Sequence, residues 1–133
     1  MDLGIVGKRA LVTGASAGIG RAVAHVLAAE GVRVVIAARN LEKLTLVRDE
    51  IAATGAEAPA MVTGDLSTAE GVAVVAQSAS AQYGGIDILV NNAGASRPMP
   101  KDADDAFWEE AFALNFSSAR RMTEALLPGM RKA

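Results

Sequence analysis

Short apolar runs alternate along the whole chain with longer segments in which apolar residues recur at helical spacing. A strand that helices cover on both faces is apolar without alternation, and a helix lying on such a sheet carries one apolar stripe. The pattern therefore predicts four strands, at residues 9–13, 33–38, 58–63 and 86–90. It predicts helices at residues 21–30, 41–54, 67–83 and about 102–127, with a loop at 95–101 before the last helix.

Residues at the predicted helix ends support these boundaries. Gly31 suits the left-handed position that ends a helix, and Asn40 can cap the helix that begins after it. Ser67-Thr68-Ala69-Glu70 forms a capping box, with Ser67 as the expected cap. Pro128-Gly129 is expected to stop the last helix, because proline removes a backbone donor and clashes with the preceding turn.

This alternation of strands and helices is typical of βαβ units around a parallel sheet, and hence of the α/β class. Right-handed connections favour the doubly wound strand order 3-2-1-4. The direction of winding then reverses between the first and fourth strands. Ligands of such sheets bind at that switch point, beyond the carboxyl ends of the strands, so Gly14 and Asn91 should face each other there.

Composition restricts the kinds of partner. The chain has 133 residues, of which 51% are hydrophobic, its formal net charge is −2, and it contains no cysteine. This indicates one ordinary globular domain and argues against nucleic acid as a partner and against a thiolate metal site. Neither a basic leader nor a long apolar run is present in the sequence, so we expect no membrane contact and a cytoplasmic location.

The first predicted strand ends in the glycine turn Thr13-Gly14-x-x-x-Gly18-x-Gly20, and a helix follows at once. Gly14 allows the tight turn, Gly18 lets the backbone approach a pyrophosphate, and Gly20 lets the helix pack closely on the strand. The turn could also be a plain tight connection. It is not a nucleoside-triphosphate loop, since Arg21-Ala22 stands where that loop needs Lys and then Ser or Thr.

A second motif, Asn91-Asn92-Ala93-Gly94, follows the fourth predicted strand. With both motifs at this separation, the whole chain resembles the short-chain dehydrogenase/reductase family, and is similar to its 3-oxoacyl-carrier-protein reductase-like members. The resemblance implies a single dinucleotide-binding domain over residues 1–133. Its fold would be a Rossmann-type doubly wound parallel sheet, truncated after the fourth strand and the long helix that follows.

The same resemblance implies roles for individual residues. The glycine turn would hold the phosphates and ribose of the cofactor, residues after the third strand its adenine, and residues after the fourth strand its nicotinamide ribose. Asn115 on the last helix matches an active-site Asn, whose helix kink and backbone carbonyl hold a water for proton relay. The implied cofactor-binding residues are Gly14, Ser16, Ala17, Gly18, Ile19, Gly20, Arg39, Asp65, Leu66, Asn91, Ala93 and Gly94.

The end of the second strand indicates which dinucleotide is bound. An acid there would bind the ribose diol and repel a 2′-phosphate, but this chain has Ala38 followed by Arg39. A guanidinium can instead form charge-assisted bonds with the phosphate. The other position that is often basic in the family is Ala17, so the preference for NADP(H) over NAD(H) depends on Arg39 alone.

The catalytic Tyr-x-x-x-Lys of the family has no counterpart in these residues. Tyr83 is the single tyrosine, and Asp87 stands four residues after it, ahead of the fourth strand. We therefore expect the N-terminal half of an NADP(H)-dependent oxidoreductase that interconverts a carbonyl and a hydroxyl, inactive by itself. The full-length form would take a small-molecule substrate and form a homo-oligomer. The alternative is a non-catalytic nucleotide-binding remnant or interaction module.

Three further side chains are expected to serve packing and not chemistry. His25 lies in a predicted helix among alanines and valines, and Trp108 and Phe112 lie one turn apart ahead of Asn115. Tyr83 is expected to lie away from the crevice.

Overall fold

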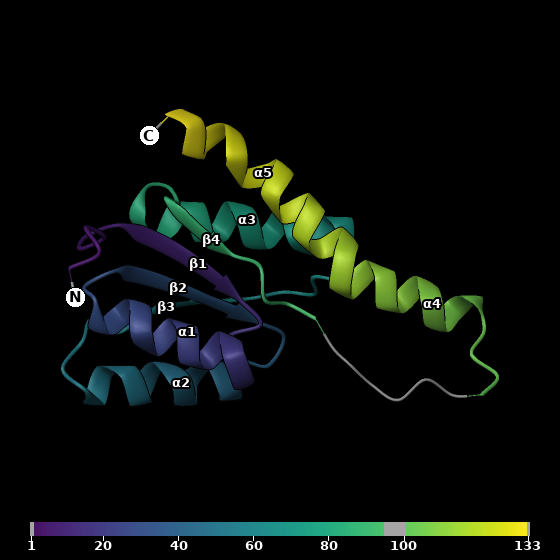
Figure 1. The fold of residues 1–133 in the computed structure, drawn as a ribbon, viewed down its shortest axis with the longest axis horizontal. Helices are drawn as coiled ribbons and strands as arrows, with labels where there is room; N and C mark the ends of the chain where they lie inside the picture. Colours follow the sequence, from purple (N-terminus) through teal and green to yellow (C-terminus); the bar gives the residue numbers. More distant parts are fainter. Residues whose placement is uncertain (1, 95–100, 133) are drawn as a thin grey trace.

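The computed structural model describes residues 2–94 and 101–132, and its sheet confirms the predicted order. Four parallel strands lie in the order β3-β2-β1-β4 (Figure 1). They are β1 (Arg9–Thr13), β2 (Arg33–Ala38), β3 (Ala60–Thr63) and β4 (Ile88–Val90). The first two have the predicted bounds, whereas β3 and β4 each begin two residues later than predicted.

Helices cover both faces of this sheet. They are α1 (Gly18–Ala29), α2 (Leu41–Ala53), α3 (Ala69–Tyr83), α4 (Asp105–Phe112) and α5 (Ser118–Lys132), with the π-helical turn η1 (Ala113–Ser117) between the last two. Figure 1 shows α1 and α2 on one face, and α3 and α5 on the other. The chain therefore forms the three-layer α/β arrangement that the pattern predicted.

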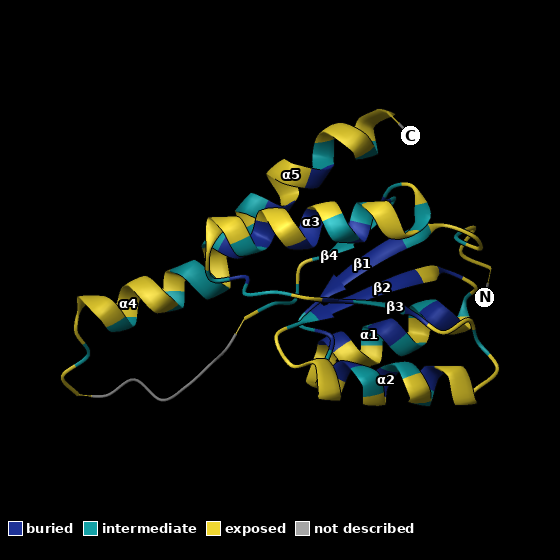
Figure 2. Cartoon of the chain, turned by 180° about the vertical axis from the view of Figure 1, so that it is seen from behind, coloured by how far each residue is buried: buried dark blue, intermediate teal, exposed yellow. Residues whose placement is uncertain are grey.

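Alternate residues of the strands enter the two apolar layers. Leu11 and Val35 pack in the layer under α3 and α5, with Met122 of α5. Val12 and Ile36 pack in the layer under α1 and α2. Their side chains are fully or almost fully buried, and Figure 2 shows the centre of the sheet as the buried part of the molecule. This double-sided burial explains why the strands are apolar without alternation.

Three helix starts differ from the predictions, and one of them is the last helical region, which begins at Asp105 and not at about residue 102. α1 begins at Gly18 and not at residue 21, because the Ala17 carbonyl already accepts the Arg21 N–H. The cap of α3 is Thr68, whose Oγ1 accepts the Gly71 N–H, and not Ser67, whose hydroxyl donates to Asp65. The predicted cap at Asn40 is confirmed, since its side chain accepts the Lys43 N–H.

The expected stop at Pro128-Gly129 is wrong, because helix α5 continues to Lys132. Pro128 lies on the exposed side of the helix, where water can reach the Glu124 carbonyl that loses its donor. Met130, two residues further on, packs against the core, and this contact favours continuation of the helix.

The expectation that Trp108 and Phe112 lie in the core is also wrong. Trp108 is 45% exposed, Phe112 60% and the neighbouring Phe116 59%. Helix α4 contains no buried residue, and Figures 1 and 2 show it extending beyond the sheet. Helical spacing of apolar residues shows that they share one face of a helix. It does not show whether another part of the chain packs against that face.

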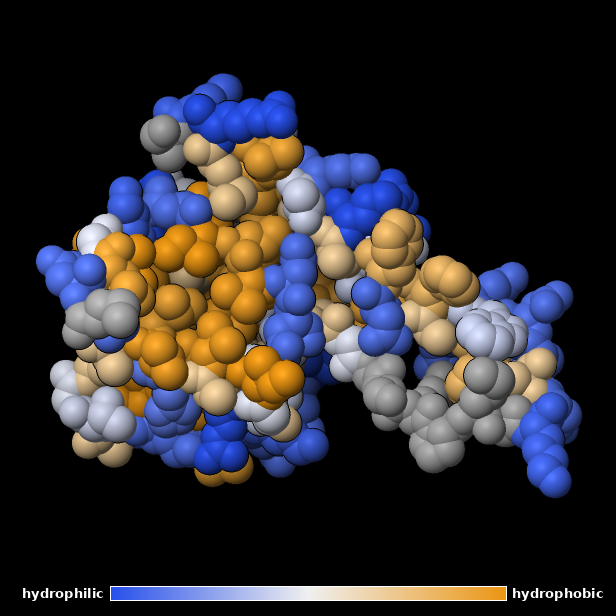
Figure 3. All heavy atoms as spheres, viewed as in Figure 1, coloured by the Kyte–Doolittle hydropathy of each residue, from blue (hydrophilic) through white to orange (hydrophobic). Residues whose placement is uncertain are grey.

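The β4 side of the sheet also presents apolar surface. Figure 3 shows apolar side chains gathered over β4 and the neighbouring part of α1. In the described residues β4 pairs with β1 alone, and all three of its residues are only half-buried. Among the described helices, none is both long enough and apolar enough to cross a lipid bilayer.

Candidate functional site

The glycine turn and the Asn91–Gly94 segment form one hydrogen-bonded unit. Thr13 is buried at the end of β1, beside the end of β4. Its Oγ1 donates to the Val90 carbonyl (3.3 Å) and accepts the N–H groups of Asn92 and Ala93 (both 3.0 Å). The Asn92 Nδ2 in turn donates to the Gly14 carbonyl at 3.3 Å. Sequence reasoning did not single out Thr13, although a hydroxyl at a buried strand end must find such partners.

The three glycines of the turn are required for different reasons. A Cβ at Gly14, whose φ is +62°, would lie 2.7 Å from the Asn92 carbonyl oxygen. A Cβ at Gly20 would collide with the Gly14 carbonyl oxygen and with Asn92 Nδ2, so both glycines allow the two motifs to approach closely. Gly18 has φ +58°, and apart from its chain neighbours and its own helix backbone no atom of the described residues lies within 4 Å of the position where its Cβ would stand. The backbone at Gly18 therefore borders open space that a phosphate group can enter.

The first turn of α1 makes this space favourable for an anion. Ala17, the N-terminal cap residue, offers no side-chain acceptor to the first N–H groups, and the first turn contains no acidic residue. The N-terminal end of a helix carries positive potential from its unpaired N–H groups. Ser16 is half-buried in the turn, whereas Ile19 is 74% exposed beside it. This arrangement fits the pyrophosphate of a dinucleotide.

Arg39 and Asp65 lie at the carboxyl ends of the neighbouring strands β2 and β3. Arg39 is exposed, and Asp65 is half-buried. Hydrogen bonds from the Ser67 hydroxyl and N–H hold the pKa of Asp65 below its ordinary value, and the nearby charge of Arg39 lowers it further. Leu66 is 5% exposed and packs in the layer under α3, so it anchors this segment to the core.

The end of β4 is tied to the long helical region. The Asn91 Nδ2 donates to Thr123 Oγ1 of α5 at 3.1 Å. A Cβ at Gly94 would lie 2.5 Å from the Asn115 Oδ1, so the two residues are in close contact. Asn115 lies in the π-helical turn η1, and its Nδ2 donates to the Ala111 carbonyl at 3.0 Å. A π-turn displaces backbone carbonyls from regular pairing, as the kink implied for Asn115 requires.

Comparison with known proteins identifies the family of this chain. The profile described as short chain dehydrogenase matches residues 8–133. The chain belongs to the short-chain dehydrogenase family. 7α-Hydroxysteroid dehydrogenase of Escherichia coli K12 is 36% identical over 131 residues, which cover 98% of this chain and 51% of that protein. 3-Oxoacyl-(acyl-carrier-protein) reductase FabG of the same strain is 38% identical over 127 residues, 95% of this chain and 50% of that protein.

Solved structures share the fold of this chain. L-Sorbose reductase of Gluconobacter frateurii, in complex with NADPH and L-sorbose, has a TM-score of 0.93 and 38% identity; the match covers 99% of this chain and 51% of that one. A metagenomic short-chain oxidoreductase in complex with NADP has a TM-score of 0.88 and 39% identity, covering 95% and 57%. The chain thus spans about half the length of the curated relatives described above.

Two candidate side chains of this family member lie outside the site. Tyr83 is at the opposite end of the sheet, where its hydroxyl donates to the Val34 carbonyl (3.5 Å) and Arg33 lies 4.2 Å from its ring centre. Burial raises the pKa of Tyr83 above its ordinary value. His25, expected to serve packing, is half-buried and faces Glu50. The His25 Nε2 lies 3.6 Å from a carboxylate oxygen of Glu50, and the same oxygen also binds Arg21. The side chain of His25 is 32% exposed.

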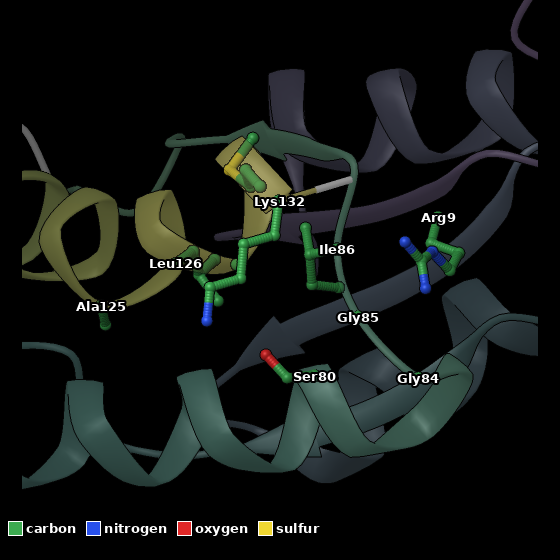
Figure 4. A pocket seen from close by; sticks show the side chains of 10 residues that line it. Arg9, Ser80, Gly84, Gly85, Ile86, Ala125, Leu126 and Lys132 are labelled. Atoms are coloured by element: carbon green, nitrogen blue, oxygen red, sulfur yellow. The ribbon is translucent and has the colours of Figure 1, made fainter.

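An ion pair with two contacts, which sequence reasoning missed, joins β1 to the segment before β4. The Arg9 Nε and Nη2 donate to the two carboxylate oxygens of Asp87, each at 2.9 Å. The Arg9 guanidinium lowers the pKa of Asp87 to about 2. A cavity of about 320 Å³ lies beside Arg9, between α3 and α5, and Ser80 and Leu126 help to line it (Figure 4). It lies at the opposite end of the sheet from the glycine turn.

Proposed function

We propose that this chain binds NADP(H) for an oxidoreductase that interconverts a carbonyl and a hydroxyl by hydride transfer. The observation that carries the proposal is the unit built around Thr13, which joins the glycine turn to the Asn91–Gly94 segment. The open space at Gly18 and the N-terminal end of α1 together form an anion-binding site, which we call the cradle. When bound, the cofactor supplies or accepts the hydride at its nicotinamide ring.

The residues around the cradle then contact different parts of the cofactor. The turn holds the phosphates, Asp65 and Leu66 border the adenine, and the end of β4 borders the nicotinamide ribose. Asn115 in η1 supports a proton relay through its backbone carbonyl. The full cofactor-binding set is Gly14, Ser16, Ala17, Gly18, Ile19, Gly20, Arg39, Asp65, Leu66, Asn91, Ala93 and Gly94.

Preference for NADP(H) rests on the end of β2. Ala38 stands where an acid would repel a 2′-phosphate, and Arg39 is exposed directly after it. The L-sorbose reductase and metagenomic oxidoreductase structures, which share the fold, are NADPH and NADP complexes. We therefore assign Arg39 to the 2′-phosphate.

The catalytic acid of the proposed reaction does not lie within these 133 residues. Their single tyrosine, Tyr83, is followed four residues later by Asp87 and lies at the wrong end of the sheet. We propose that the chain alone holds the cofactor without turnover, and that the complete enzyme acts on a small carbonyl or alcohol. The same observation supports the alternative, a non-catalytic nucleotide-binding or interaction module. Reading the gene beyond the codon for Ala133 separates the two, since only the enzyme needs a Tyr-x-x-x-Lys there.

We also propose that the protein forms a homo-oligomer. The exposed aromatic side chains of α4 and η1 and the half-buried residues of β4 support this proposal, because exposed apolar side chains favour association. The cytoplasmic location expected from the sequence stays a prediction.

The cradle can be tested with two matched glycine substitutions. Gly18 and Gly55 both have positive φ and open space around the Cβ position, but Gly55 follows α2, away from the cradle. Gly18→Val and Gly55→Val should cost similar backbone strain, whereas only Gly18→Val should abolish NADPH binding measured by nucleotide fluorescence. Equal binding by the two variants would contradict the proposed cradle.

A further inference from the structure

Ser118 lies where η1 meets α5, and it is 3% exposed. Its N–H donates to the Ala113 carbonyl, five residues back, as in a π-helix. In a regular α-helix the same N–H would donate to the Leu114 carbonyl, four residues back. Here the Ser118 hydroxyl donates to that carbonyl instead, at 2.6 Å. One residue therefore supplies both hydrogen bonds at the point where the register of the helix changes.

This hydroxyl bond differs from those of similar spacing in the regular helices. Thr45 of α2 also donates to a carbonyl four residues back, that of Leu41, at 2.8 Å. In a regular helix such a carbonyl already accepts a backbone N–H, so the hydroxyl is only a second donor. The N–H of Ser118 passes over the Leu114 carbonyl, so here the hydroxyl replaces the backbone bond. Losing it would leave a polar group in the half-buried part of the helix without this partner, which is costly.

The register of η1 also decides how α4 is rotated relative to the sheet. A π-turn contains one residue more than the α-helical turn that it replaces, and one residue corresponds to about 100° around the helix axis. Helix α5, on one side of η1, is anchored in the core by Met122 and Leu126. Helix α4, on the other side, contains no buried residue, so no core contact of its own side chains resists a rotation.

The π register places Asn115 beside the end of β4. A Cβ at Gly94 would lie 2.5 Å from Asn115 Oδ1. A return to the α register would turn Asn115 away from Gly94, and the exposed rings of Trp108 and Phe112 would turn with it. We propose that Ser118 is a positioning residue, whose hydroxyl holds η1 in the π register and so fixes the rotation of α4 and Asn115 relative to the sheet.

Crystal structures of the 133-residue chain and its variants report the register directly. In the Ser118→Ala variant we expect the N–H of residue 118 to move from the Ala113 carbonyl to the Leu114 carbonyl. Helix α4 should then rotate by about 100°, and the contact between Asn115 and Gly94 should be lost. This change pairs the Leu114 carbonyl with a backbone N–H, whereas the π register would leave it without the hydroxyl bond.

Two matched variants are the controls. Ser117→Ala removes the neighbouring hydroxyl of η1, and Thr45→Ala removes a hydroxyl with the same spacing to its carbonyl in a regular helix. Both should keep the π register and the rotation of α4. A Ser118 hydroxyl that only stabilises the helix would lower the melting temperature when removed and leave the register as it is. A π register in the Ser118→Ala structure therefore overturns the proposal.

Deletion of Ser117 gives a second test, which does not require Ser118→Ala to fold by itself. Removing one residue from η1 should restore the α register without rotating α4, because the N–H of Ser118 then reaches the Ala113 carbonyl over four residues. The deletion variant should fold, and in it Ser118→Ala should lower the melting temperature no more than Thr45→Ala does. In the unmodified chain the loss should be larger, or the register should change.

An equal loss of melting temperature from Ser118→Ala in both backgrounds, with the π register kept in the unmodified one, contradicts the role of Ser118. None of these measurements uses a nucleotide. The role of Ser118 and the proposed binding of NADP(H) can therefore fail separately.

Discussion

At the scale of single residues, the chain uses charged groups at both ends of the sheet for different purposes. Arg9 and Asp87 form a two-contact ion pair that ties the start of β1 to the segment before β4. At the opposite end, Arg39 is exposed and its charge acts on Asp65. The Arg9–Asp87 pair stabilises the fold, whereas the Arg39 guanidinium stays accessible to a ligand.

The Asp87 ion pair predicts how stability depends on acid. The folded pKa of Asp87 is about 2, below the ordinary 3.8, so the charged form stabilises the fold and this contribution is present above pH 4. It should be lost as the pH falls from about 4 towards 2. Asp87→Asn should lower the melting temperature at pH 7 and flatten its decline over that window in thermal unfolding. Asp49→Asn, at an exposed ion pair on α2, is the control and should keep the decline.

Arg39 predicts the choice of cofactor. Arg39→Ala, in a full-length form, should weaken NADPH binding by about 2 kcal/mol, roughly thirtyfold in Kd, through loss of a charge-assisted pair. Binding of NADH, which lacks the 2′-phosphate, should change little. Titration calorimetry with both nucleotides measures this, and Arg48→Ala on α2 controls for loss of net charge. Equal weakening of the two nucleotides would show that Arg39 does not contact the phosphate.

At the scale of elements, function depends on how β1 and β4 meet. Neither strand end carries the cradle alone, because Thr13 provides the acceptor for two backbone N–H groups that follow β4. The same edge is connected to the long helical region through Asn91 and Thr123. The geometry of the glycine turn therefore depends on this junction between β1 and β4.

Removing the junction should destabilise the whole sheet. Thr13→Val leaves two N–H groups without their acceptor, so we expect a loss of about 1–3 kcal/mol in the free energy of unfolding. Thr13→Ser keeps the hydroxyl and should lose less. Thr45→Val, which removes a half-buried hydroxyl whose partner is the Leu41 carbonyl within α2, is the matched control and should be near neutral in denaturant unfolding. A neutral Thr13→Val would mean that the N–H groups find other acceptors.

At the scale of the whole molecule, apolar surface remains at the β4 side of the sheet and along α4 (Figure 3). An open strand edge offers unpaired backbone groups to a neighbouring chain, and apolar side chains strengthen that contact.

The isolated 133-residue chain should self-associate through the β4 edge. We expect light scattering to show oligomers or poor solubility that increase with concentration. Ile88→Lys, which places a charge on this edge strand, should shift the chain towards a monomer. Val74→Lys, at a 54% exposed position on α3, is the control and should leave association unchanged. A stable monomer of the unmodified chain at high concentration contradicts this prediction.

The isolated chain should also show no hydride transfer. Without a positioned Tyr–Lys acid, general acid catalysis of about 10²–10⁴-fold is missing, together with an oriented substrate pocket. NADPH absorbance followed with a panel of ketones and aldehydes should not fall faster than in buffer. Turnover that Tyr83→Phe abolishes would mean that an unexpected acid had formed.

The sequence by itself determined the class of fold, the strand order and the two motifs of the cradle. These follow from local rules: runs buried on both faces are apolar throughout, glycine alone adopts positive φ easily, and right-handed connections restrict the topology. The cap at Asn40 and the bounds of β1 and β2 were predictable for the same reason, since each depends on neighbouring residues.

Only the tertiary structure decided what distant residues do to one another. Pro128 is tolerated because Met130 meets the core, and Trp108 is exposed because α4 extends beyond the sheet. Ser67 holds Asp65 instead of capping α3, Thr13 joins two motifs almost eighty residues apart, and Arg9 pairs with Asp87. Hydrophobic periodicity and secondary-structure propensity describe only the segment in which a residue lies. The contacts named above depend on which distant segments the fold brings together.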